Sequence, residues 1–151
     1  MILPEARRYS HDELKVSAQR TANVYAEIAN KTLGCNIPIP VKMDFNLCNE
    51  EPKCAGRASS TMLVEINMIL FEDNILYLLN DTIPHEIGHL IQYDKFDLKG
   101  ARVQNHGAEW QEIMRRLGKI PHKTHTLDTT RALAHSKAWK KANKKKNAVI
   151  E

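Results

Sequence analysis

Residues 81–96 read DTIPHEIGHLIQYDKF, and the two histidines in this stretch, His85 and His89, decide how the rest of the chain is interpreted. Residues four apart on an α-helix lie about 40° apart around the axis and one turn apart along it. The two imidazoles can therefore lie side by side and hold one metal ion. Glu86 is turned about 100° from His85, so its carboxylate can reach a water on the metal without binding the metal itself.

The residues around this motif favour a metal over an ordinary buried helix. Burying two imidazoles and a carboxylate among apolar side chains is costly unless they have partners, and one metal ion satisfies both imidazoles. A catalytic zinc ion has three protein ligands and an open position for water. We therefore predict one catalytic zinc ion, with Glu86 as the general base. The alternative is a pair of core histidines that are only hydrogen-bonded. The apolar neighbours are Ile83, Ile87, Leu90 and Ile91.

The third zinc ligand has to come from outside this helix. A third histidine six residues after His89 would mark a metzincin, but Lys95 occupies that position and excludes the subclass. Glu109 and Glu112 are available on the next predicted helix, as in thermolysin-type enzymes. His106 stands at the start of that helix and competes with them. Spacing alone leaves these alternatives open.

The first half of the chain predicts a helix followed by a small sheet. Residues 10–13 have the Ser-x-x-Glu form of a capping box, which starts a helix, and Gly34 is a suitable stop. Residues 37–46 contain two prolines and alternate in polarity, so an extended segment is expected there. Residues 53–71 are typical of one or two further strands.

The second half predicts helices. We expect Asn80 and Asp81 to end the preceding segment, with Asp81 or Thr82 capping a new helix that accommodates Pro84 in its first turn. Another helix should run from Ala108 to Gly118. The order predicts an α+β fold, with a small, mainly antiparallel sheet packed on the helices that include the histidine motif.

The chain has 151 residues and a net charge of +4, and the positive excess is concentrated at one end. Seven of the 22 basic residues and one of the 18 acidic residues fall within 131–151. That segment is +6 and the remainder is −2. Such a tail is either a solubilising extension or an arm that binds a polyanion. No apolar run is long enough to span a membrane and no secretory signal is evident, so we expect a cytoplasmic protein.

Four stretches together resemble the core of the SprT-like metalloproteases, the zincin group that includes Spartan. They are CAGRASSTMLVEIN (54–67), IPHEIGHLIQYDKF (83–96), HGAEWQEIMRRLG (106–118) and PHKTHTLD (121–128). The resemblance implies a zincin-like fold and a zinc metallopeptidase. It also implies His106 as the third ligand, with Gly107 and Trp110 as the matched framework, and residues 54–67 as the edge strand for the substrate. By the same resemblance, the substrates are proteins associated with DNA, including crosslinked ones.

The chain also departs from this family, because many members continue into a cysteine-rich zinc ribbon and no cysteine here lies beyond Cys54. We expect that second zinc to be absent. The predicted organisation is a metalloprotease domain over 1–128 and a basic, partly helical or disordered tail over 129–151. The tail, chiefly Lys137–Lys146, is predicted to bind DNA. Two alternatives are a peptidase with no nucleic-acid role and a DNA-bound, zinc-binding adaptor without proteolysis.

Overall fold

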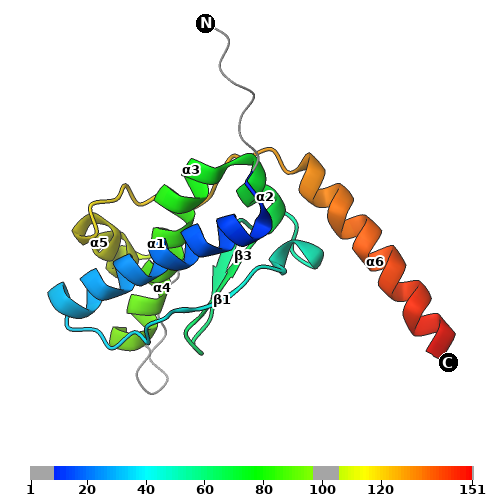
Figure 1. The fold of residues 1–151 in the computed structure, drawn as a ribbon. Coiled ribbons are helices and arrows are strands. Elements are labelled where there is room, and N and C mark those ends of the chain that lie inside the picture. Colours follow the sequence, from blue (N-terminus) through cyan, green and yellow to red (C-terminus); the bar gives the residue numbers. More distant parts are fainter. Residues whose placement is uncertain (1–8, 97–105, 151) are drawn as a thin grey trace, which may run out of the picture.

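The computed structural model describes residues 9–96 and 106–150, and within them the predicted α+β class is confirmed. The arrangement is consistent with a zincin-like fold, in which helices pack against a small sheet (Figure 1). In chain order the elements are α1 (His11–Thr32), β1 (Lys42–Asp44), the short helix η1 (Leu47–Asn49), β2 (Gly56–Ala58), β3 (Leu63–Ile66), α2 (Met68–Asp73), α3 (Ile75–Tyr77), the π-helical segment η2 (Leu78–Thr82), α4 (Ile83–Phe96), α5 (Ala108–Arg116) and α6 (Thr130–Ile150).

The sheet has the strand order β1-β3-β2. β2 pairs with β3 in antiparallel fashion, whereas β1 runs parallel to β3, so the sheet is mixed rather than mainly antiparallel. The chain reverses direction twice between β1 and β3, once before β2 and once after it, so β3 runs parallel to β1. β2 is an edge strand, and its inward face lies against α4.

Helix α1 forms as its sequence predicts and packs against α4. Ser10 and Glu13 form a complete capping box, with two reciprocal hydrogen bonds of 3.1 Å. The helix ends at Thr32, and Gly34 follows with a φ of +67°, a conformation that glycine adopts without strain. The buried face is built mainly of alanines, which allow close approach to α4. It consists of Leu14, Ala18, Ala22, Ala26 and Ala29.

The predicted break before the metal-motif helix is wrong. The backbone stays helical through Asn80 and Asp81, as the π-helical segment η2, and passes directly into α4. In η2 the N–H of Ile83 donates to the carbonyl oxygen of Leu78, five residues earlier. The wider π turn accommodates Pro84, whose ring would clash with the preceding turn of a regular α-helix. Residues 78–96 therefore form one continuous helical unit.

Asn67, at the end of β3, is fully buried and holds several segments together. Its side-chain oxygen accepts from the Leu70 N–H and caps α2, at 3.1 Å. Its side-chain nitrogen donates to the carbonyl oxygens of Pro52 and Cys54, at 3.0 and 2.9 Å. The segment leading into β2 is thus fixed to β3 before the strand begins.

Helix α6 packs on η1 and α2 through residues near its beginning. Ala132 and Ser136 are buried, and the Ser136 hydroxyl donates to the carbonyl oxygen of Asn49 at 2.7 Å. The second half projects away from the other elements (Figure 1). The expectation that residues 129–151 form a unit separate from 1–128 stays a prediction. In the part of the chain that the structure describes, no helix has the length and apolar character needed to cross a membrane.

Candidate metal centre

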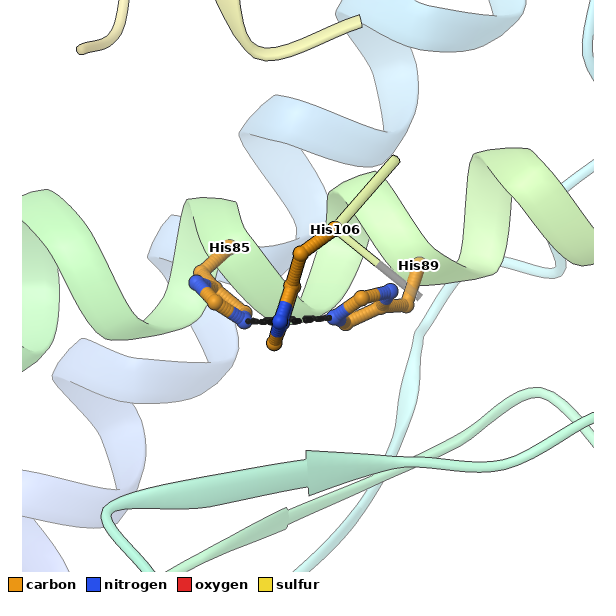
Figure 2. Close-up of side chains that lie close together, drawn as sticks. All are labelled: His85, His89 and His106. Carbon is orange, nitrogen blue, oxygen red and sulfur yellow. Dashed lines mark hydrogen bonds between the residues drawn. The ribbon is translucent and has the colours of Figure 1, made fainter. Parts of the chain in front are cut away.

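Three histidines from two segments of the chain meet at one point (Figure 2). His85 and His89 lie one turn apart on α4, and His106 lies just before α5. The Nε2 atom of His89 is 3.1 Å from each of the other two Nε2 atoms, which are 2.9 Å from one another. Among the described residues, these three make up the group that could hold a metal ion.

Hydrogen bonds at the Nδ1 atoms fix the tautomers of the two α4 histidines. The Nδ1 atom of His85 lies 3.1 Å from the carbonyl oxygen of His122, and that of His89 lies 2.9 Å from Oε1 of Gln92. Both oxygens are acceptors, so each Nδ1 atom holds a hydrogen and donates it. Both Nε2 atoms therefore present a lone pair to the shared point, which is the form that binds a metal.

The donor set fits a tetrahedral cation. With metal–nitrogen bonds of about 2.0–2.1 Å, tetrahedral geometry places neighbouring ligand nitrogens about 3.3 Å apart. The observed separations of 2.9–3.1 Å are close to that value. Without a cation, the lone pairs of His85 and His89 would repel each other at this distance. Three imidazoles leave a fourth position free, as in a catalytic site.

Trp110 on α5 packs beneath all three imidazoles. It is fully buried, its ring stacks on His89 with centroids 5.7 Å apart, and its Nε1–H donates to the carbonyl oxygen of His85 at 3.3 Å. Gly88 makes this packing possible, because a Cβ there would lie 2.9 Å from Nε1 of Trp110 and 3.0 Å from the Met114 sulfur. The glycine inside the motif therefore allows α5 to approach α4 closely.

His106 has a left-handed backbone, with a φ of +61°. This conformation is uncommon for a residue with a side chain and is stabilised only by its surroundings. The carbonyl oxygen of His106 accepts from Nε2 of Gln111 at 3.1 Å, and Gly107 caps α5 immediately afterwards. The strained backbone turns the imidazole toward α4.

Glu86 lies beside this centre and is almost fully buried. Its Oε1 atom is 3.6 Å from Nε2 of His85, so the carboxylate faces the same point as the imidazoles. Burial raises the pKa of Glu86 to about 8. A cation on the histidines would lower this pKa, because positive charge nearby favours the carboxylate.

The histidines themselves are neutral near pH 7. Burial, with smaller contributions from the neighbouring histidines, lowers the pKa of His85 to about 3. Burial likewise lowers the pKa of His89 to about 4, against a weaker opposing effect of Gln92. Neutral imidazoles do not have to lose a proton before they bind a metal.

The centre opens into a cavity of about 750 Å³. One wall is the edge strand β2, and the other is the segment between α5 and α6. His125 bridges the two walls: its Nε2–H donates to the carbonyl oxygen of Lys53 at 2.7 Å, and its Nδ1 accepts from the Leu127 N–H at 3.1 Å. Both ring nitrogens bond to backbone groups, so His125 holds the two walls together.

The alternative third ligands do not join the histidines. Glu109 is exposed, and Glu112 pairs with Arg116 on the same helix at 3.4 Å. Sequence reasoning did not assign a role to Gln92 or to the carbonyl group of His122. Gln92 could have been found, since it is a polar residue three positions after His89 on an apolar helix face. A backbone carbonyl group leaves no signal in a sequence.

The α+β fold and the three-histidine centre beside a buried glutamate define a domain of the zincin-like class. A model of the SprT-like family matches residues 25–132, and the chain belongs to this family. The match includes β2, β3, α4 and α5, and so every residue of the centre.

Several relatives are named Protein SprT. That of Vibrio atlanticus (strain LGP32) is 32% identical over 105 residues, which are 68% of this chain and 58% of the relative. That of Vibrio parahaemolyticus (serotype O3:K6) is 32% identical over 120 residues, 78% of this chain and 68% of the relative. That of Pseudomonas fluorescens (strain ATCC BAA-477) is 40% identical over 70 residues, 46% of this chain and 41% of the relative. The chain thus matches 58% of the length of the first relative. No solved structure matches it.

Proposed function

We propose that this chain is a zinc-dependent metallopeptidase that hydrolyses peptide bonds with a metal-activated water. The observation that carries the proposal is the convergence of three Nε2 atoms within 3.1 Å of one another, next to a buried carboxylate that is not one of them. A purely structural metal site has no use for such a carboxylate. This argues against an adaptor that binds zinc without cleaving protein.

Each residue of the centre has a distinct part in the proposed reaction. His85, His89 and His106 would hold the zinc ion, which lowers the pKa of a bound water to roughly 7 and polarises the substrate carbonyl group. Glu86 takes the proton from the attacking water and passes it to the leaving amine. Gln92 and the His122 carbonyl group keep the two α4 imidazoles in the binding tautomer.

The free edge of β2 suits an extended polypeptide. In the β2–β3 ladder, the Asn67 N–H bonds to Ala55 and the Ser59 N–H to Leu63. Antiparallel residues alternate in direction, so Gly56 and Ala58 between these pairs present their backbone groups to the outer side. Both line the cavity. A substrate strand can pair there and bring a peptide bond to the centre.

The first test is metal-dependent cleavage. The purified chain, supplied with one equivalent of zinc, is expected to cleave an unfolded protein, and a chelator should abolish cleavage until zinc is restored. Fragments are measured by gel electrophoresis and mass spectrometry. Stoichiometric zinc without cleavage of any unfolded or DNA-bound protein would favour the adaptor. Cleavage that persists in the metal-free chain would refute the proposal.

We further propose that α6 binds DNA and brings the peptidase to proteins on it. Helix α6 carries exposed lysines, and its second half projects away from the other elements (Figure 1). Phosphates of DNA can therefore reach these lysines. Removing the whole tail is a poor test, since Ala132 and Ser136 are buried against the body. Neutralising the exposed lysines of α6 is a better test, because it removes their charge and keeps this packing. Among the α6 residues whose side chains the structure describes, the exposed lysines are Lys137, Lys140, Lys141 and Lys144.

Replacing these four lysines by glutamine should weaken DNA binding at least about tenfold at low salt. It should also reduce the slope of log affinity against log salt by up to about 3.6, because each phosphate contact contributes about 0.9. Fluorescence anisotropy with a duplex at several salt concentrations measures both quantities.

The matched control removes four exposed positive charges elsewhere: Arg20, Lys31, Lys42 and Lys95. It should keep most of the affinity. Equal losses in the two variants would show that only net charge matters. Unchanged affinity in the α6 variant would leave a peptidase that does not bind DNA through α6.

A further inference from the structure

Gly56 is the point at which the edge strand touches the proposed general base. A Cβ atom at this position would lie 2.9 Å from Cγ2 of Thr82 and 3.0 Å from Cγ of Glu86. It would also lie 3.4 Å from the carbonyl oxygen of Glu65. The first two distances are too short for ordinary carbon contacts, whose optimum is about 3.5–4.0 Å. Any side chain here forces the strand or its neighbours to move.

Strand β2 is held in place from the β3 side, opposite its free edge. The N–H of Asn67 donates to the carbonyl oxygen of Ala55 at 2.9 Å. The Asn67 side chain also donates to the carbonyl oxygens of Pro52 and Cys54, just before Ala55. One residue further on, Arg57 forms two hydrogen bonds with Glu65 on β3, at 2.6 and 3.1 Å. These contacts on both sides of Gly56 resist a retreat of β2 from α4.

The two side chains that face Gly56 across this contact are also held in place. Thr82 and Glu86 lie one turn apart on the continuous η2–α4 helix, and both are buried. Because both side chains are packed among other residues, neither can move into solvent while the helix stays in place. The methylene of Glu86 that a Cβ would press upon is directly attached to the carboxyl carbon. Displacing it therefore moves the carboxylate relative to the histidines.

We propose that Gly56 is a positioning residue: its lack of a side chain sets the separation between the substrate-binding edge of β2 and the carboxylate of Glu86. The same residue presents its own N–H and C=O to the outer edge, so one position fixes both the substrate strand and the base. The inference rests on the proposed peptidase function. It adds a spacing requirement that the zinc ligands do not impose.

The test is Gly56→Ala. Zinc content should equal that of the parent, because the three atoms nearest to the added methyl group belong to Thr82, Glu86 and Glu65 and not to the histidines. We expect kcat to fall about 100-fold, the loss typical of a displacement of about 1 Å at a reacting group, with a smaller change in KM. Elemental analysis and steady-state kinetics measure these quantities. A kcat equal to that of the parent would overturn the inference.

A second variant separates positioning from simple overcrowding. Thr82→Ser removes Cγ2, the nearer of the two obstructing atoms, and leaves the contact with Glu86. In the double variant Gly56→Ala/Thr82→Ser, we expect the thermal midpoint to recover and kcat to stay low. If kcat also returned to the value for Thr82→Ser alone, crowding against Thr82 would explain the whole loss and the inference would be wrong.

Gly34→Ala is the matched control, because it also adds one methyl group to a glycine. That methyl meets no atom within 4 Å, and the φ of +67° makes the variant less stable. It should lower the thermal midpoint and leave kcat unchanged.

A crystal structure of Gly56→Ala tests the spacing without turnover. We expect an altered distance between residue 56 and the Glu86 carboxylate, with the three histidines in place. An unmoved Glu86 would overturn the inference. Absence of cleavage by the parent chain would instead count against the proposed function, so the two failures are distinguishable.

Discussion

Replacing Glu86 by glutamine is expected to reduce peptide hydrolysis by about a thousandfold, within the range that a general acid–base contributes. Glutamine has nearly the same shape as glutamate but cannot accept the proton of the attacking water. The carboxylate lies 3.6 Å from Nε2 of His85 and is not part of the group that could hold the metal. The variant should therefore keep one zinc ion per chain. Cleavage assays and elemental analysis on the same preparation measure both.

Glu112→Gln is the control for this change. Glu112 is an exposed acid on α5 that pairs with Arg116, away from the histidines, so its removal should alter neither zinc nor turnover. Full activity in Glu86→Gln would rule out Glu86 as the base. Loss of zinc together with activity would instead make Glu86 a ligand.

The second large effect is expected at His106. Its replacement leaves two protein ligands, and zinc affinity should fall by more than the 10–100-fold that loss of a second-sphere partner causes. Asparagine is the suitable substitute, because it tolerates the left-handed backbone seen here at φ +61° better than alanine does. His106→Asn should thus remain folded, bind zinc weakly and cleave no substrate. Titration against a competing chelator measures the affinity.

His135→Ala serves as the matched control. This histidine lies on α6 and contacts Asn49, so its loss should leave zinc affinity unchanged. Zinc bound at full affinity by His106→Asn would mean that the third ligand is another group. Glu109 and Glu112 would then be tested next.

Features that depend on a few adjacent residues could be predicted from the sequence. The capping box at Ser10 and Glu13 and the stop at Gly34 appear as predicted, because each depends on a few adjacent residues. His85 and His89 also lie side by side, since helical spacing alone brings them together. The class of fold followed from the order of such elements.

Local sequence patterns did not predict the features that depend on contacts between distant residues. The π-helical turn of η2 was missed, because the usual helix-ending signals at Asn80 and Asp81 are overridden by packing and by the geometry that Pro84 requires. Spacing alone could not choose between His106 and Glu109, since the choice depends on how α5 packs on α4 through Gly88. The close contact of Gly56 with Glu86 joins residues thirty positions apart and is visible only in three dimensions.

X-ray absorption spectroscopy of the zinc-loaded parent chain identifies the atoms bound to the metal. We expect one zinc ion per chain with three imidazole nitrogens at about 2.0–2.1 Å, one further light-atom ligand and no sulfur. A sulfur ligand at about 2.3 Å would place a cysteine on the metal; Cys54, which lines the same cavity, would be the first to examine. Such a result, or a chain that binds no stoichiometric zinc, would contradict the three-histidine site.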